Sequence, residues 1–304
     1  MSILPRVIRA MQRIAPLELS ESAWDNVGLL CRFVFELIAN SSCDYIEPPF
    51  PRQSANKIFL TIDLTPQVLE EAISDPAVGT IIAYHPPIFK AMKRLTIQDT
   101  KQAIVMKAIA KGVAIYSPHT AADNSKVRLF CLLCIITLVN DWLAKGLGKG
   151  ICSPIYPAKN PPEGQEQSGT GRLFTFQETV SLFTVIERIK KLTNLKHVRV
   201  ATAERHFSAP VSTVGICAGS GSSVLGGVQA DIYFTGEMGH HDVLAALAQG
   251  TSVVLCEHTN TERGYLRAVL MPRLMSILAN EPDAYEQPVE VVCSEIDRDP
   301  LVIM

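Results

Sequence analysis

Histidine and carboxylate side chains recur in this 304-residue sequence directly after short apolar runs. The clearest case is His85, which follows the run Gly79–Tyr84 and precedes two prolines. Proline donates no backbone hydrogen bond, so Pro86 and Pro87 end the predicted strand and leave His85 at its carboxyl end. Imidazole and carboxylate are ligands that Zn²⁺, Mn²⁺ and Fe²⁺ share, so the pattern predicts a divalent metal site. The candidate residues are His85, Asp123 with His119, Glu237, and His258 with Glu262.

Each of these residues also has a structural explanation. A single histidine at a strand end is more often a core residue with satisfied hydrogen bonds than a metal ligand. Asp123 is also typical of a turn, and Thr259 with Glu262 matches the capping box that begins many helices. His258 and Glu262, however, are four residues apart and therefore share one side of a helix start. The recurrence of such residues at one sheet edge favours a metal site over the separate explanations.

The strands that must position these side chains are predicted from short apolar segments separated by helical patterns. Residues 57–63 form one strand, Thr65 and Pro66 begin a helix, and residues 79–84 form the next strand. This alternation is typical of a β-α-β unit and predicts a parallel sheet. The carboxyl ends of parallel strands share one edge, where open α/β proteins bind their ligands, so residues distant in sequence can meet there.

The length of the chain and a second series of strands predict two domains. Residues 1–150 are expected to form an N-terminal α/β domain with the first metal ligands. Pro154–Gly171 is rich in proline, glycine and polar residues, which indicates a loop or linker. Residues 151–304 are expected to form a second α/β region, in which 252–304 return to complete the metal site. The predicted fold is α/β, with two sub-domains on mostly parallel sheets and the metal site at the strand carboxyl ends.

Composition argues against several classes of function. The formal net charge of −2 gives no basic patch of the kind that direct binding to DNA or RNA requires. No apolar run reaches the roughly 18 to 20 residues that span a bilayer. Eight scattered cysteines are typical of reduced intracellular thiols. Cys131 and Cys134 have the spacing of a metal or redox motif, but they lie inside an apolar run without a second pair nearby.

Six short motifs occur in an order that resembles a known family. They are Trp24–Leu29, Leu60–Thr65, Tyr84–Phe89, His119–Asp123, Thr235–Glu237 and His258–Glu262. Together they resemble the NIF-three-like family (NGG-interacting factor three), whose bacterial members are often described as GTP cyclohydrolase type two homologs. The resemblance implies a two-domain α/β protein with a dinuclear metal site, assembled into ring-like homo-oligomers. By position, it implies that the metal ligands are His85, Asp123, His258 and Glu262.

The sequence departs from this family pattern at the site and in two segments. Bacterial members have two adjacent histidines where this chain has Tyr84 and His85. A phenol, with a pKa of about 10, is a poorer ligand at neutral pH than imidazole, so we expect occupancy nearer one metal ion than two. Residues 31–53 and 124–138 are foreign to the pattern. The almost uncharged run Val127–Val139 suggests a misassigned exon boundary or unusual splicing, and predicts a poorly packed excursion from the sheet.

Two functions of different classes follow. The first is a divalent-metal-binding NIF-three-like protein that regulates transcription indirectly through protein partners, as the family resemblance implies for eukaryotic members. The alternative is a metal-dependent hydrolase of the GTP cyclohydrolase or phosphohydrolase type, in which Glu237 or Glu262 would handle protons. In either case we expect a homo-oligomer in the cytoplasm, with the nucleus as a second location, and neither direct nucleic-acid binding nor a membrane. The sequence names no substrate.

Overall fold

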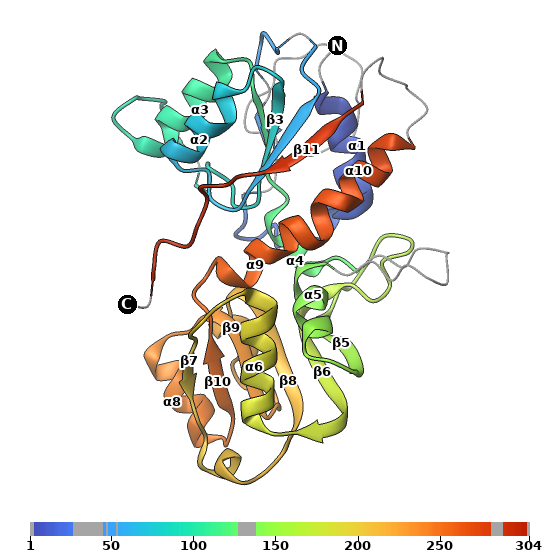
Figure 1. Ribbon diagram of the computed structural model, residues 1–304, viewed down its shortest axis with the longest axis vertical. Helices are drawn as coiled ribbons and strands as arrows, with labels where there is room; N and C mark the ends of the chain where they lie inside the picture. The colour runs from blue at the N-terminus through green and yellow to red at the C-terminus, as the bar shows by residue number, and fades with distance from the viewer. Residues whose placement is uncertain are drawn as a thin grey trace. The chain divides into compact units, whose positions relative to one another are not determined.

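The computed structural model describes residues 3–26, 45–46, 48–52, 54–90, 92–126, 138–280 and 288–302. Contacts divide the chain into two compact units, whose elements are labelled in Figure 1. The first comprises Met1–Ala122 and Leu266–Asp297, and the second comprises Asp123–Tyr265 and Arg298–Met304. Residue 150, at which we expected the first domain to end, begins a strand of the second unit.

The first unit is built on a sheet with strand order β1-β4-β3-β2-β11. Four of its strands run parallel, and β1 pairs antiparallel with β4. Every residue of β3 is buried, as expected for a central strand that is covered on both faces. The predicted β-α-β unit is confirmed, because β2 and β3 are parallel neighbours. The strands are β1 Tyr45–Ile46, β2 Lys57–Thr61, β3 Val78–Ala83, β4 Ala114–Tyr116 and β11 Glu290–Cys293.

Helices cover both faces of this first sheet. Figure 1 shows α2 and α3 on one face, and α1 and α10 on the other. On the α2 and α3 face, the strand residues Phe59, Ile81 and Ile115 belong to one buried apolar cluster with residues of both helices. These three side chains come from three neighbouring strands, so they form the floor on which the two helices pack. The helices are α1 Leu4–Ile14, α2 Pro66–Ser74, α3 Thr100–Ala110 and α10 Met271–Ala279.

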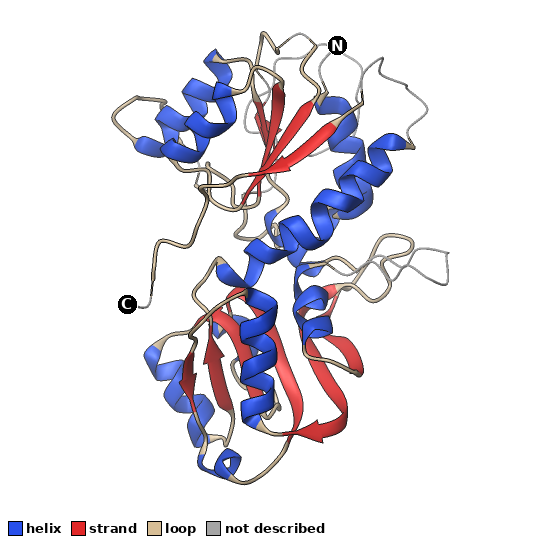
Figure 2. Ribbon diagram, in the orientation of Figure 1, coloured by secondary structure: helices blue, strands red, loops and turns tan. Residues whose placement is uncertain are grey.

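The second unit contains a six-stranded sheet with order β5-β6-β8-β9-β10-β7. Its centre, β8 to β10, is parallel, whereas β5 and β6 on one side and β7 on the other pair antiparallel with their neighbours. Figure 2 shows these strands as one twisted layer with helices beside it. The strands are β5 Gly150–Pro157, β6 Gly169–Val180, β7 Arg199–Ala201, β8 Val211–Ser220, β9 Ile232–Glu237 and β10 Ser252–Leu255.

The loop predicted at Pro154–Gly171 is present as residues 158–168, but the two ends of the predicted segment lie in strands. The loop joins β5 and β6 into an antiparallel hairpin, which is paired from Gly150 opposite Phe176 to Pro157 opposite Gly169. The prolines of β5 are tolerated because β5 lies at the edge of the sheet, where a missing N–H does not interrupt a second ladder. Proline and glycine therefore indicated the edge strand and its turn, and did not indicate a domain boundary.

The helices of the second unit pack on its sheet, and a buried ion pair ties one of them in place. Arg172 of β6 is fully buried, and its Nε and Nη2 donate to the two carboxylate oxygens of Asp141 at 3.1 and 2.9 Å. A bidentate pair of this kind fixes both partners, because removing one would leave a buried charge. The helices are α5 Val139–Gly146, α6 Leu182–Thr193, α7 Ser222–Leu225, α8 His240–Ala248 and α9 Asn260–Tyr265.

The expectations about residues 31–53 and 124–138 fall largely outside the described residues, as does most of the run Val127–Val139. Of these segments the structure describes 45–46, 48–52, 124–126 and 138–139. The excursion and splicing hypotheses therefore stay predictions. Within the ranges described above, no helix combines the length and the apolar character that crossing a membrane requires.

Candidate metal centre

His85 lies directly beyond the end of β3 in the first unit. The pairing of β2 and β3 continues past the strands, because Tyr84 N–H donates to Thr61 O at 2.9 Å and His85 N–H donates to Ile62 O at 3.1 Å. The imidazole Nδ1 lies 2.9 Å from Asp63 Oδ1, in the segment that follows β2. A carboxylate at Nδ1 fixes the ring and its tautomer, so Nε2 is the ring atom that can ligate a metal.

A second histidine of the first unit, His119, is held in the same way. It begins α4, which spans His119–Asn124, and its backbone has a φ of +32°. Its Nδ1 lies 2.7 Å from Asp25 Oδ1, and its ring centroid is 5.4 Å from that of His85. Burial by itself raises the pKa of Asp25. The hydrogen bond and charge of His119, with hydrogen bonds from Thr120, outweigh that effect and hold this pKa below its usual value.

The second unit supplies His258 and Glu262 from the turn after β10 and the first residues of α9. His258 Nδ1 lies 2.9 Å from Glu237 Oε1 at the end of β9, and His258 Nε2 lies 3.9 Å from Glu262 Oε1. Glu262 is buried, with 2% of its surface exposed. Two donor atoms that each lie about 2.0–2.2 Å from one ion can have such a separation. Glu237 therefore orients the imidazole, and Nε2 and Glu262 present donors on the same side.

The capping-box explanation of Glu262 is not what the structure shows at this helix start. In a capping box the threonine side chain accepts the N–H of the residue three positions on. Here the Glu262 N–H donates to the backbone carbonyl of Thr259, and Thr259 Oγ1 donates to Asp299 Oδ2 at 2.7 Å. Glu257, the residue before His258, has a φ of +64°, which is an unfavourable conformation for a side chain of this size.

Gly219, near the end of β8, borders the two donor atoms of this pair. Its φ is +63°, and a Cβ at this position would lie 2.9 Å from both His258 Nε2 and Glu262 Oε1. Any other residue would therefore fill the space next to the donors, in addition to being strained. Its N–H donates to Thr261 Oγ1 at 2.8 Å, which holds the glycine against α9. The space that only a glycine leaves open fits an ion bound by His258 and Glu262.

Asp123 belongs to the second unit and lies in α4. Its carbonyl accepts a hydrogen bond from Asn140 Nδ2 at 3.1 Å. Its carboxylate acts electrostatically on Cys217 of β8, as does that of Glu262. Burial, followed by the negative charges of Asp123 and Glu262, raises the pKa of the Cys217 thiol. Both predicted carboxylate ligands thus influence the same buried residue of the second unit.

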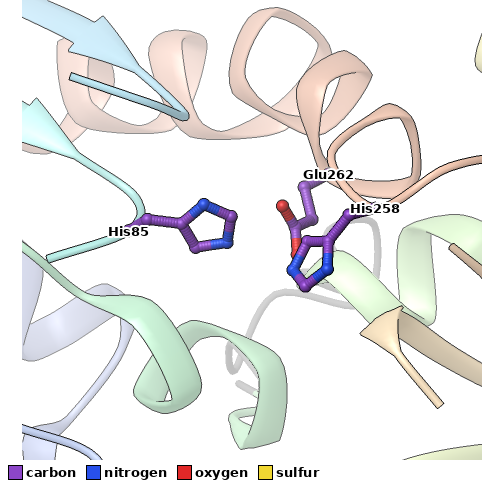
Figure 3. Close-up of side chains that lie close together, drawn as sticks. All are labelled: His85, His258 and Glu262. Carbon is purple, nitrogen blue, oxygen red and sulfur yellow. The ribbon is translucent and has the colours of Figure 1, made fainter. Parts of the chain in front are cut away.

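The side chains of His85, His258 and Glu262, drawn in Figure 3, could together hold a metal ion. His85 belongs to the first unit, and the other two residues belong to the second. Asp123 is not part of this group of three. Tyr84 is fully buried, and its ring lies 5.6 Å from that of His85 in an edge-on arrangement.

The fold and these side chains define a class of two-unit α/β proteins with histidine and carboxylate donors beyond their strand ends. Residues 3–300 match the family Duf34/NIF3 (NGG1p interacting factor 3), and the chain belongs to this family. The resemblance drawn from the six motifs is thereby confirmed.

Relatives cover nearly the whole chain. The Schizosaccharomyces pombe "Protein NIF3 homolog" is 40% identical over 306 residues, which cover 100% of this chain and 99% of the relative. The human "NIF3-like protein 1" is 35% identical, covering 99% and 92% of the two chains. The Saccharomyces cerevisiae "NGG1-interacting factor 3" is 31% identical, covering 99% and 96%.

Solved structures share the fold. A Bacillus cereus protein related to NIF3 has a TM-score of 0.72 at 19% identity, covering 99% of this chain and 98% of that one. Reduced HcgD from Methanocaldococcus jannaschii has a TM-score of 0.66 at 20% identity, covering 96% and 97%. At these identities the likeness concerns the fold alone.

Three residues of the site were not singled out from the sequence, namely Asp25, Asp63 and Gly219. Asp63 is the last residue of the predicted strand 57–63, so the strand-end argument that selected His85 would have selected it too. The role of Asp25 emerges from its contact with His119, 94 residues later in the chain. The closeness of Gly219 to His258 follows from the order of β8, β9 and β10 in the sheet, which the sequence does not show.

Proposed function

We propose that this chain binds one or two divalent metal ions, of the kind Zn²⁺, Mn²⁺ or Fe²⁺, through His85, Asp123, His258 and Glu262. The observation that carries the proposal is the pair of donors at Gly219, His258 Nε2 and Glu262 Oε1, next to a space that a Cβ would fill. A mixed set of imidazoles and carboxylates suits these three metals. The number of ions rests on the predicted weakness of Tyr84 as a ligand.

The residues behind the ligands support this assignment. Asp63 and Glu237 each contact an imidazole Nδ1 at 2.9 Å, so both rings would present Nε2 in the neutral form that metals bind. The carboxylates of Asp123 and Glu262 would offset the charge of a divalent cation. When bound, such a cation supplies Lewis acidity and lowers the pKa of a coordinated water.

For the biological role, we propose a protein-binding regulator of transcription that acts indirectly, in the cytoplasm and the nucleus, as a homo-oligomer. The support is the name of the yeast relative, NGG1-interacting factor 3, together with a net charge of −2 that does not favour nucleic acid. Binding of purified protein to NGG1 should then exceed its binding to a DNA duplex at low salt. Tight, salt-sensitive binding to the duplex would contradict the indirect role, and a monomer in sedimentation would contradict the assembly.

The alternative is a metal-dependent hydrolase of the GTP cyclohydrolase or phosphohydrolase type. It is favoured by the exposure of Glu237, whose side chain is 49% accessible while it contacts His258. In this proposal Glu237 or Glu262 would accept and donate the protons of the reaction. Hydrolysis of GTP or a phosphate ester that disappears in Glu237→Gln at saturating metal concentration would favour the enzyme, and equal low turnover in both proteins would favour the regulator.

Elemental analysis of the purified protein tests the metal site. His258→Ala should lose most of its bound metal, because few protein ligands remain to hold the ion. His240→Ala is the matched control, since His240 is an exposed histidine at the start of α8 in the same unit. Full metal content in His258→Ala, or equal loss in both variants, would show that His258 is not a ligand.

A further inference from the structure

Aromatic side chains of the first unit surround His119. The centroid of its ring lies 6.1 Å from those of Trp24 and Phe89, 6.4 Å from that of Tyr84 and 5.4 Å from that of His85. The contacts of Trp24, Tyr84 and Phe89 with this imidazole are edge-on. The histidine that Asp25 holds at Nδ1 is therefore enclosed by four rings.

Two of these rings reach the surface. Trp24 is 57% exposed and Phe89 is 37% exposed, and their centroids are 6.2 Å apart at an interplanar angle of 52°. The other tryptophan of the chain, Trp142, is 8% exposed. Burying a large aromatic ring lowers the free energy. An exposed pair of such rings beside two histidines therefore indicates a binding surface on which a ligand ring can stack.

The surface is built on an anchored backbone. Asn26 Nδ2 donates to Ile88 O at 2.6 Å, which ties the segment of Trp24 to the residue before Phe89. The Glu21 N–H donates to Thr120 Oγ1 at 3.0 Å, and Asp25 contacts His119 at 2.7 Å. Trp24 is thus fixed from both sides along the chain, and the two rings form a preorganised surface, here called the aromatic platform (Trp24 and Phe89).

The loop that begins at Phe89 is positively charged. Lys90, Lys93 and Arg94 are all exposed, and no carboxylate occurs in the sequence between His85 and Asp99. This local excess contrasts with the net charge of −2 for the whole chain. An anionic group on a ligand would be attracted to this loop, and more strongly at low salt.

We propose that the aromatic platform binds a planar heteroaromatic ring joined to an anionic group, the chemistry of a nucleotide, with the ring stacked on Trp24 and Phe89 and the anion toward Lys90, Lys93 and Arg94. The bound ring lies beside His119 and His85, so the platform supplies the ligand class for the proposed metal site. The inference rests on the proposed function only for that last step, because stacking on Trp24 needs no metal.

Tryptophan fluorescence with adenosine 5′-monophosphate as the probe tests the platform. The nucleotide should quench the emission of exposed Trp24 in a saturable way, both in the protein as purified and after treatment with a chelator. Quenching that survives the chelator separates the platform from the metal site. Absence of saturable quenching at millimolar nucleotide in both samples would overturn the proposal, and would leave the metal analysis of His258→Ala unaffected.

Equilibrium dialysis of labelled nucleotide against variants completes the test. Trp24→Leu should bind about tenfold more weakly, in line with the loss of one stacked ring, while Trp24→Phe should retain most of the affinity. Phe207→Leu, which changes a phenylalanine of the second unit that is 79% exposed, is the control and should bind as the parent does. Equal affinity of Trp24→Leu and Phe207→Leu would overturn the proposal.

The anionic part of the ligand has its own test. Adenosine and ribose 5-phosphate should each bind more weakly than the nucleotide, and a Lys93→Glu, Arg94→Glu double variant should lose the preference for the nucleotide over adenosine. Lys145→Glu with Lys149→Glu, two exposed lysines of the second unit, is the charge-matched control. An unchanged preference in the first double variant would show that the loop does not bind the anion.

Discussion

Two histidines of the second unit, His206 and His258, differ in the groups that their ring nitrogens contact. The side chain of His206 is 0% exposed, with Nδ1 2.7 Å from Ser252 Oγ and Nε2 3.8 Å from Asp231 Oδ1. The side chain of His258 is 36% exposed, with Nδ1 on Glu237 and Nε2 toward Glu262 and the bare Cα of Gly219. Both pair with acids, so pairing alone does not identify a ligand. What distinguishes His258, the proposed ligand, is the space beside Nε2 that Gly219 leaves open.

Gly219→Ala is the substitution expected to have the largest effect on this comparison. The new Cβ would meet both donor atoms at 2.9 Å, so we expect metal affinity to fall on the order of 100-fold or more. Gly227→Ala is a close control, because Gly227 also has a positive φ, +81°, but a Cβ there meets nothing within 4 Å. Competition with a chromogenic chelator measures both variants. Similar losses in the two would mean that backbone strain, and not the donor space, is responsible.

Glu237→Gln tests the other side of the His258 ring. The amide keeps the shape of the side chain but no longer holds the Nδ1 proton with a full negative charge. We expect metal affinity to fall about 10- to 100-fold, the usual range for a partner that orients a ligating histidine. Glu178→Gln, an exposed position of β6, provides the control. Unchanged affinity in the chelator competition would remove Glu237 from the site.

His206 should affect stability and its dependence on pH, while leaving metal binding unchanged. Burial, then the charge of Arg205, lowers the pKa of His206, against the opposing effect of Asp231. The unfolded chain therefore binds this proton more readily, so stability should fall as the pH drops below about 6.5 and level off above it. His206→Gln should reduce this acid sensitivity by on the order of 1 kcal/mol in urea unfolding at pH 7 and pH 5. A parallel pH dependence of the two proteins would contradict this assignment.

Tyr84→His extends the comparison to the first unit and should have the smallest effect. A histidine here adds an imidazole next to His85, and we expect a second metal ion to bind several-fold more tightly. The gain is limited because Tyr84 is fully buried and its replacement leaves space in the core. Isothermal titration with Zn²⁺ reports the stoichiometry, with Tyr84→Phe as the control. The same number of ions in all three proteins would count against a role for this position.

The parts of the fold that the sequence predicted are those with local signals. The strand ending at His85 was predicted because Pro86 and Pro87 mark its end, and α2 because Thr65 accepts the Val68 N–H as an N-cap. β11 was not predicted, since its four residues pair with β2, more than 200 residues earlier in the chain. No local pattern contains such a pairing. The hairpin of β5 and β6 was missed for a different reason, because proline at an edge strand has the composition of a loop.

Among the candidate ligands, too, those with a local sequence signal were predicted. His258 and Glu262 were predicted because their spacing of four residues places them on one side of a helix start. Of the carboxylates behind the histidines, Glu237 was among the candidates, but Asp25 was missed, since it is 94 residues away from its partner His119. Such partners depend on the order of strands and on turns such as that of Asp25, and both are set by packing over the whole unit.

The arrangement of the two units along the chain has a consequence for synthesis on the ribosome. The second unit is nearly one continuous stretch, Asp123–Tyr265, completed only by Arg298–Met304. Its six strands are all translated once residue 255 has been added, so its sheet can form while the remaining residues are still being made. The first unit must wait longer. Until Glu290–Cys293 emerge, β2 is an open sheet edge that can pair with the wrong strand, and β11 then closes this edge.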